Sequence, residues 1–154
     1  MEYGSIEREF TVEASPEVVF EVLSSPAHIA AWWGGAEADV APIAGATGEL
    51  AWGRGTPDAH IVPLTVVEAD PPRTFSFRWA YAEGQVPTES NSFLVSFLLT
   101  PSGAGTVVRL TEVGFRERGW EAAVLEAHYE QHRTGWDTHL GGLRRYLGRL
   151  VATR

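Results

Sequence analysis

A helical pattern of apolar residues constrains the fold most; it begins near Trp120 and continues almost to the end of the chain. Apolar side chains recur there at the three- and four-residue spacing that places them on one face of an α-helix. This stripe consists of Leu125, His132, Trp136, Leu140, Leu143, Leu147 and Leu150. Gly135, Gly141 and Gly142 weaken such a helix by ~1 kcal/mol each relative to alanine, so we expect a bend there and no break.

Six strands and two short helices are predicted before this long helix. The first strand is Ser5–Val12, and two helices follow it: one starts with Ser15 as N-cap and ends at Pro26, and the other runs from Ala27 to Trp33. Residues 34–46 are predicted as loop. The remaining strands lie near Gly48–Gly53, His60–Ala69, Thr74–Tyr81, Ser90–Thr100 and Thr106–Phe115. Short breaks rich in glycine and proline join these strands, which indicates an antiparallel meander.

The order of elements predicts an α+β fold. One amphipathic helix cannot cover both faces of a six-stranded sheet, so the curved antiparallel sheet should wrap around the long C-terminal helix. The two short helices lie between strands 1 and 2 of this arrangement. A chain of 154 residues is the size of one domain, which we expect to span residues 1–154. The gap between helix and sheet is the expected functional site.

Composition excludes several classes of function. The chain has no cysteine, which rules out disulfides, thiolate catalysis and cysteine-bound zinc and makes the cytoplasm the expected location. The net charge of −8 argues against nucleic acid and anionic membranes as partners. No apolar run approaches the ~20 residues of a membrane span. Phosphate-binding glycine loops and nucleophile elbows are absent as well, so no cofactor is expected.

Aromatic residues carry the main functional signal. Strict alternation places Phe75, Phe77, Trp79 and Tyr81 on one strand face, and another face carries Phe93, Val95, Phe97 and Leu99. These rings could line a flat-walled apolar cavity, or they could simply form the core. The predicted ligand-binding residues are Trp32, Trp33, Trp52, Phe77, Trp79, Tyr81, Phe93, Phe97, His132 and Trp136. Adjacent tryptophans on a short helix cannot both face inward, so one of Trp32 and Trp33 is expected at the surface, unless the pair plugs the space between helix and sheet.

Glu112 is the candidate catalytic residue. It shares a strand face with Val108 and Leu110, so an inward apolar face would bury its carboxyl group, which could then act as acid or base. Pairing with an arginine, or a bulge that turns it outward, is the alternative.

Other polar residues give weaker signals. His128 and His132 are neighbours on the long helix, but a metal site would need a third ligand, such as His60 or Glu112, so we expect no metal. Arg54, Arg78 and Arg109 are candidate anchors for an anionic ligand head, although strand arginines are usually solvated.

Four stretches, in order along nearly the whole chain, carry a family resemblance. They are Ala14–Phe20, Trp32–Gly34, Val66–Arg73 leading into Phe75–Trp79, and Gly105–Glu112 followed by Gly135-Trp136 and the leucine-rich end. Together they resemble the SRPBCC superfamily of START-like, helix-grip domains, and most of all the homologues of the heat-shock-protein-90 ATPase activator. The resemblance implies a single START-like domain of the kind that holds lipids, hormones or polyketides, or that catalyses cyclisation or hydrolysis.

The function predicted from these observations is binding of a small apolar or aromatic metabolite or lipid in an internal cavity between sheet and helix. The first alternative is a cyclase, dehydratase or hydrolase of the same fold, which would need a convergent acid–base pair. The second is a co-chaperone-like interaction module, which would need a large exposed patch. A small apolar ligand is the expected partner, and a homodimer remains open.

Overall fold

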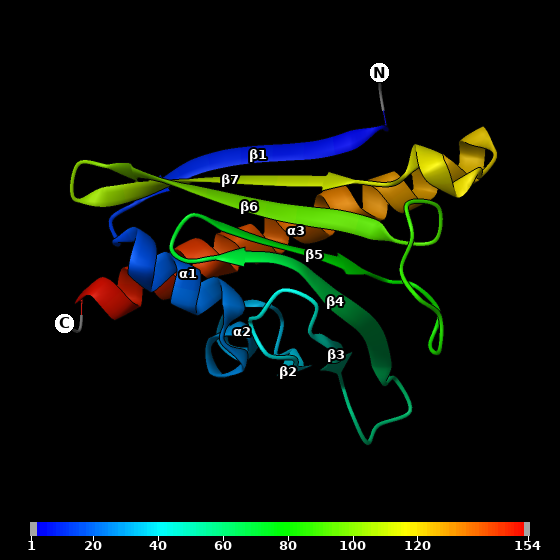
Figure 1. The fold of residues 1–154 in the computed structure, drawn as a ribbon, viewed down its shortest axis with the longest axis horizontal. Coiled ribbons are helices and arrows are strands. Elements are labelled where there is room, and N and C mark those ends of the chain that lie inside the picture. Colours follow the sequence, from blue (N-terminus) through cyan, green and yellow to red (C-terminus); the bar gives the residue numbers. More distant parts are fainter. Residues whose placement is uncertain (1–2, 153–154) are drawn as a thin grey trace.

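The computed structural model describes residues 3–152, which form a seven-stranded sheet, three α-helices and one 3₁₀ turn (Figure 1). The elements are β1 (Ser5–Val12), α1 (Pro16–Ser24), α2 (Pro26–Trp32), β2 (Glu37–Asp39), β3 (Thr47–Trp52), β4 (His60–Asp70), β5 (Thr74–Trp79), β6 (Phe93–Ser102), β7 (Gly105–Val113), η1 (Arg116–Arg118) and α3 (Ala122–Ala152). Within this range, no helix combines the length and apolar character that a membrane span requires.

The sheet is curved and fully antiparallel, with the strand order β1-β7-β6-β5-β4-β3-β2. Helix α3 lies along one face of this sheet, and α1 and α2 lie near one end of it (Figure 1). The predicted α+β class, the long C-terminal helix and the two short helices between the first two strands are therefore confirmed. Ser15 caps α1 as predicted, because its Oγ accepts a hydrogen bond from the Val18 amide.

The predicted count of six strands is wrong by one. Strand β2 lies inside the segment predicted as loop, and it pairs with β3 through the matches Glu37↔Ala51 and Asp39↔Glu49. Three residues are too few to show alternation, so the sequence pattern does not reveal this strand. Its pairing depends on Gly48, because a Cβ atom at that position would lie 1.8 Å from the Asp39 carbonyl oxygen.

The core lies between α3 and the sheet. Helix α3 continues without a break through its glycines, and its predicted stripe faces inward, with Trp136, Leu140, Leu143 and Leu147 at most 5% exposed. Opposite them, Phe93, Val95, Phe97 and Leu99 of β6 are at most 2% exposed, as strand alternation predicted. The helix and the sheet therefore bury the two faces that the sequence pattern marked as apolar.

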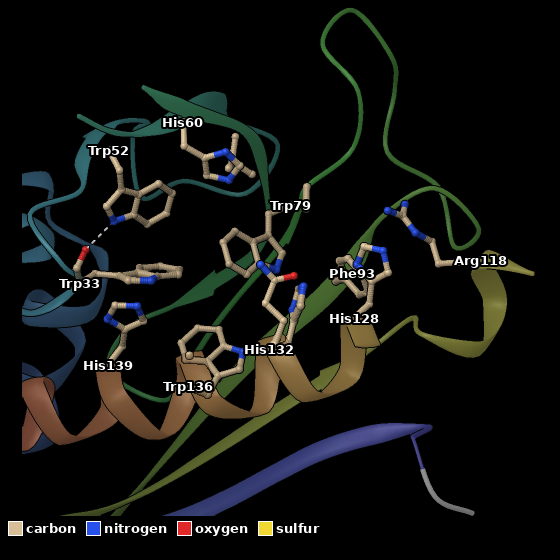
Figure 2. A pocket seen from close by; sticks show the side chains of 14 residues that line it. Trp33, Trp52, His60, Trp79, Phe93, Arg118, His128, His132, Trp136 and His139 are labelled. Atoms are coloured by element: carbon tan, nitrogen blue, oxygen red, sulfur yellow. Dashed lines mark hydrogen bonds between the residues drawn. The ribbon is translucent and has the colours of Figure 1, made fainter. Parts of the chain in front are cut away.

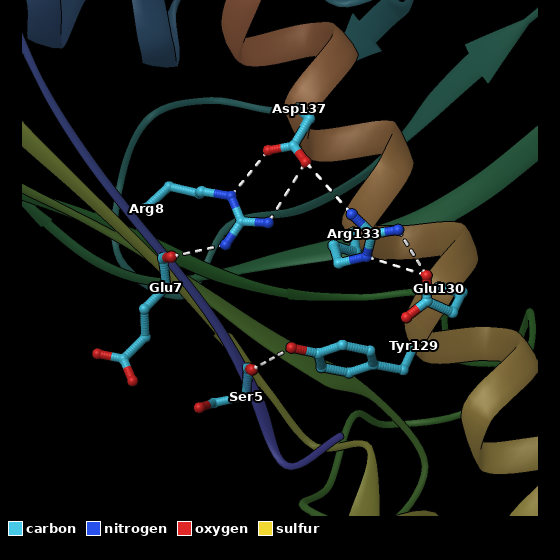
Figure 3. Close-up of polar contacts among 7 residues, drawn as sticks. All are labelled: Ser5, Glu7, Arg8, Tyr129, Glu130, Arg133 and Asp137. Atoms are coloured by element: carbon cyan, nitrogen blue, oxygen red, sulfur yellow. Dashed lines mark hydrogen bonds and ion pairs between the residues drawn. The ribbon is translucent and has the colours of Figure 1, made fainter. Parts of the chain in front are cut away.

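Polar contacts fix α3 against the edge strand β1 (Figure 3). The Arg8 guanidinium donates to the Asp137 carboxylate at 2.7 Å, and it lowers the pKa of that carboxyl group. About two helical turns away, the Tyr129 hydroxyl donates to the Ser5 carbonyl oxygen at 2.9 Å. Both contacts are on the side of α3 that faces β1, so they set which side chains of the helix face the middle of the sheet.

Candidate functional site

A pocket of about 400 Å³ lies between α3 and strands β3 to β6, and we call it the aromatic pocket (Figure 2). Four indole rings form much of its wall: Trp33 follows α2, Trp52 ends β3, Trp79 ends β5 and Trp136 belongs to α3. The Trp33 ring is central, since its centroid lies 5.2 to 6.0 Å from the other three. The remaining lining residues are His60, Val62, Ala80, Phe93, Arg118, His128, Gln131, His132, Gly135 and His139.

Trp32 and Trp33 are both buried, at 3% and 4% exposure, so the prediction that one lies at the surface is wrong. Trp33 follows the last residue of α2 and has a non-helical backbone. Its side chain can therefore point in a direction close to that of Trp32, which two adjacent residues within a helix could not do. The two rings stack at 5.2 Å with 14° between their planes. Trp32 donates to the Val22 carbonyl oxygen and lies in the core, while Trp33 faces the aromatic pocket.

Glu112 is completely buried on the inward face of β7, as its alternation with Val108 and Leu110 predicted. It forms no ion pair with an arginine in the described chain. Instead its carboxylate accepts three hydrogen bonds from side chains that line the aromatic pocket: Trp79 Nε1 at 2.8 Å, Trp136 Nε1 at 2.8 Å and His132 Nδ1 at 2.9 Å. Glu112 thus lies behind the pocket wall and orients three of its members.

His132 presents its second ring nitrogen to the pocket. Because a carboxylate oxygen can only accept, we assign the proton of the contact with Glu112 to His132 Nδ1. In the neutral ring Nε2 then carries the lone pair, and it has no partner among the described residues. This nitrogen is accessible, since no fully buried nitrogen or oxygen of the described side chains lacks a hydrogen-bond partner. A histidine oriented by a buried carboxylate in this way can accept or donate a proton at Nε2.

Arg118 and His128 lie at one end of the aromatic pocket, and Trp33, Trp52 and His139 lie at the other (Figure 2). The His128 ring stacks on Trp120 at 4.0 Å. Burial lowers the pKa of His128, and electrostatic repulsion by the neighbouring His132 and Arg118 lowers it further. His128 is therefore neutral at pH 7 and can act as a hydrogen-bond donor or acceptor for a bound molecule.

Burial also lowers the pKa of His139 below its usual 6.5, which gives a testable pH dependence. The unfolded chain takes up this proton at a higher pH than the folded protein does. The free energy of unfolding is therefore undiminished by His139 above about pH 6.5. It decreases as the pH falls from there through the lower pKa of His139 in the folded protein. His139→Gln should therefore reduce the fall in unfolding free energy between about pH 7 and pH 5, measured by urea denaturation. If the unfolding free energy of the variant falls with pH as steeply as that of the parent protein, His139 is not the source of this pH dependence.

The predicted site residues fall into two groups. Trp33, Trp52, Trp79, Phe93, His132 and Trp136 line the aromatic pocket. Phe77 and Phe97 do not line it; they lie in the core, with ring centroids 6.1 Å from Trp33 and Trp136 respectively. Tyr81 lies outside β5, which ends at Trp79. A positive φ at Ala80 turns the chain there, and the Tyr81 hydroxyl hydrogen-bonds Thr65 instead.

The three strand arginines proposed as anion anchors are all engaged outside the pocket. Arg54 pairs with Glu49, Arg109 pairs with Glu7, and Arg78 donates to Thr88 and Ser92. The predicted ligand-binding residues lacked eight that line the pocket, namely His60, Val62, Ala80, Arg118, His128, Gln131, Gly135 and His139. His139 could have been found, because it follows His132 by seven residues and therefore shares its helical face. Arg118 offered no such signal, since its 3₁₀ turn has no apolar periodicity.

No group of acidic or histidine side chains in residues 3–152 is arranged to hold a metal ion. The four histidines that line the aromatic pocket, His60, His128, His132 and His139, are spread along it.

Comparison with known proteins places the chain in a family. Residues 13–148 match the family described as Activator of Hsp90 ATPase homolog 1-like protein. The chain belongs to this family. No curated protein matches the sequence. As a member of the AHSA1-like family, the chain has the helix-grip fold, which is the fold that the resemblance of its sequence motifs implied.

Solved structures show the same fold. Protein MLL2253 from Mesorhizobium loti is 22% identical with a TM-score of 0.74, over 94% of this chain and 97% of that one. The Aha1 dimer from Colwellia psychrerythraea is 23% identical with a TM-score of 0.68, over 93% and 95%. DynU16, a protein of the dynemicin biosynthetic locus, is 23% identical with a TM-score of 0.70, and the match covers 94% of this chain but 47% of DynU16. At these identities the likeness concerns the fold alone.

Proposed function

We propose that this AHSA1-like protein binds a small apolar or aromatic molecule in the aromatic pocket. The observation that carries the proposal is the set of four indole rings around one space of about 400 Å³, which is within the range of pockets for small ligands. Flat aromatic walls favour a flat or apolar partner, because ring contacts add to the free energy gained from burying apolar surface. The polar groups at the two ends of the pocket would orient this partner.

Gly135 allows a direct test, because it lines the aromatic pocket and a Cβ there would meet no atom within 4 Å. Gly135→Leu should fill part of the pocket and weaken binding of the neutral dye N-phenyl-1-naphthylamine roughly tenfold or more, as expected when about one buried apolar side chain's worth of contact is lost. Dye binding is measured by its emission and by quenching of tryptophan fluorescence.

Gly148→Leu is the matched control, since Gly148 lies on the same helix with the same free space but outside the aromatic pocket. Both changes should favour the helix by a similar amount, because each replaces glycine by a good helix former. Dye binding that is absent in the parent protein, or equally strong in the Gly135→Leu variant, would remove the basis for the proposal.

A second candidate function, acid–base catalysis on such a ligand, is supported by the contact between Glu112 and His132. The buried carboxylate and the pocket histidine form the kind of pair in which one group orients the other. In this alternative His132 touches the substrate, and Glu112 acts through it as a positioning residue. Cyclisation, dehydration and hydrolysis all need such a proton-transfer group.

A homodimer is the proposed assembly, supported by the Colwellia psychrerythraea protein, whose solution structure is a dimer. Light scattering on the purified chain tests this proposal independently of any ligand. A monomeric mass at micromolar concentration would count against it.

A further inference from the structure

Arg118 differs from five other arginines of the described chain in the way its charge is compensated. Five arginines of the described chain form ion pairs with carboxylates, namely Arg8, Arg54, Arg73, Arg109 and Arg133. Arg118 has no carboxylate partner among the described residues. Its guanidinium carbon instead lies 4.8 Å from the centre of the Phe93 ring and 4.9 Å from that of Trp120. These contacts hold the side chain at the end of the aromatic pocket, which it lines.

The charge of the pocket has the opposite sign to the charge of the protein. The whole chain carries −8, yet among residues 3–152 no aspartate or glutamate lines the aromatic pocket, and Arg118 is the only arginine that does. Glu112 offers the pocket no free carboxylate oxygen, because it is buried behind the wall and its oxygens already accept three hydrogen bonds. The other polar lining groups are four histidines and one glutamine.

A partly buried cation without a counter-ion is costly, and a bound anion would offset that cost. Arg118 is partly buried, so its guanidinium has lost part of its hydration, and this burial lowers its pKa. Arginine presents several N–H donors in a planar fork that matches a carboxylate in a bidentate manner. The Trp33 indole N–H also has no acceptor among the described residues, so a donor remains available at the far end of the pocket as well.

We infer that the aromatic pocket recognises a flat aromatic monocarboxylate, with the carboxylate on Arg118 and the ring system among the indoles of Trp33, Trp79 and Trp136. This inference rests on the proposed binding function and names the chemical class of its ligand. The single positive charge of Arg118 at the end of this aromatic pocket would pair with the single carboxylate of an aromatic ligand. A phosphate ester would bring close to two charges to a single arginine, with no second cation to meet it.

Calorimetric titration with two compounds of the same shape tests the inference. 2-Naphthoate carries the carboxylate, and 2-naphthamide replaces it with a neutral amide. We expect the acid to bind roughly 10–100-fold more tightly than the amide, as one hydrogen-bonded charge pair provides. Arg118→Gln should remove this preference, so that the acid and the amide bind to the variant with similar affinities.

Arg116→Gln is the matched control, because it removes the same charge from the same 3₁₀ turn at an exposed position outside the pocket. It should keep the preference for the acid. Circular dichroism and binding of the neutral dye show that both variants retain the fold and the pocket.

Four results would overturn the inference, and they differ in whether the proposed binding function survives. Equal binding of acid and amide, or an acid preference that survives Arg118→Gln, removes the anion site but keeps the proposed binding function. Tighter binding of 2-naphthyl phosphate than of 2-naphthoate assigns the site to a different class of anion. If 2-naphthoate, 2-naphthamide and the neutral dye all fail to bind to the parent protein, the proposed function fails together with the inference.

Discussion

Replacing Trp136 by alanine should lower the free energy of unfolding by about 3–5 kcal/mol, the usual range for a large buried aromatic side chain. The ring is 3% exposed, and it contacts Trp33 at a centroid distance of 5.2 Å and both Trp79 and Phe97 at 6.1 Å. The change would open a cavity between α3 and the sheet. It would also leave one oxygen of the buried Glu112 with a single donor, since Trp136 Nε1 would be gone.

Urea denaturation followed by circular dichroism measures this loss. Trp120→Ala is the matched control, because it makes the same chemical change at a position that is only partly buried. Its cost should be clearly smaller. If both variants lose the same free energy of unfolding, burial of Trp136 between helix and sheet contributes no more to stability than the partly buried Trp120 does.

Glu112→Gln should separate catalysis from binding. Glutamine keeps the shape of the side chain, but its amide nitrogen would face an N–H donor where a carboxylate oxygen now accepts. In an enzyme, turnover should drop by roughly 10²–10⁴-fold, because His132 would lose the carboxylate that orients it for proton transfer. In a binding protein, the same change should alter affinity or stability by about 1–3 kcal/mol.

Hydrolysis of 2-naphthyl acetate provides a reaction in which to measure this effect. His132→Gln should reduce the rate to the same extent as Glu112→Gln, since the two residues would act as one unit. His128→Gln is the control, because His128 also lines the pocket from α3 but has no contact with Glu112. Equal losses in the two histidine variants, or no hydrolysis by the parent protein, would favour binding over catalysis.

Local patterns in the sequence predicted the fold well. The stripe that includes Leu143 and Leu147 required α3 to bury one face, and alternation in β5 and β6 required the sheet to meet it. Strand β2 escaped this reasoning because three residues show no period, and its pairing depends on a close approach at Gly48 that only the folded chain reveals.

The candidate site could be predicted only in part. Burial of Glu112 followed from the strand register, and pocket lining by Trp79 and Trp136 followed from their inward faces. The three donors of Glu112 come from β5 and α3, so their convergence is a long-range contact that no local spacing encodes. Arg118 was missed for a related reason: its importance lies in the lack of a carboxylate partner, and the sequence does not show which charges meet.

The two outer strands of the sheet have different capacities for pairing with another chain. Exposed strand edges can template unwanted association, and short or charged edges are known safeguards against it. Strand β2 offers only three residues, whereas β1 offers eight that include Glu7, Arg8 and Glu9. Extension of the sheet from one copy into another would therefore have to use β1. Neither β1 nor its neighbour β7 lines the aromatic pocket, so pairing of two copies along that edge would involve none of the strands that form the pocket.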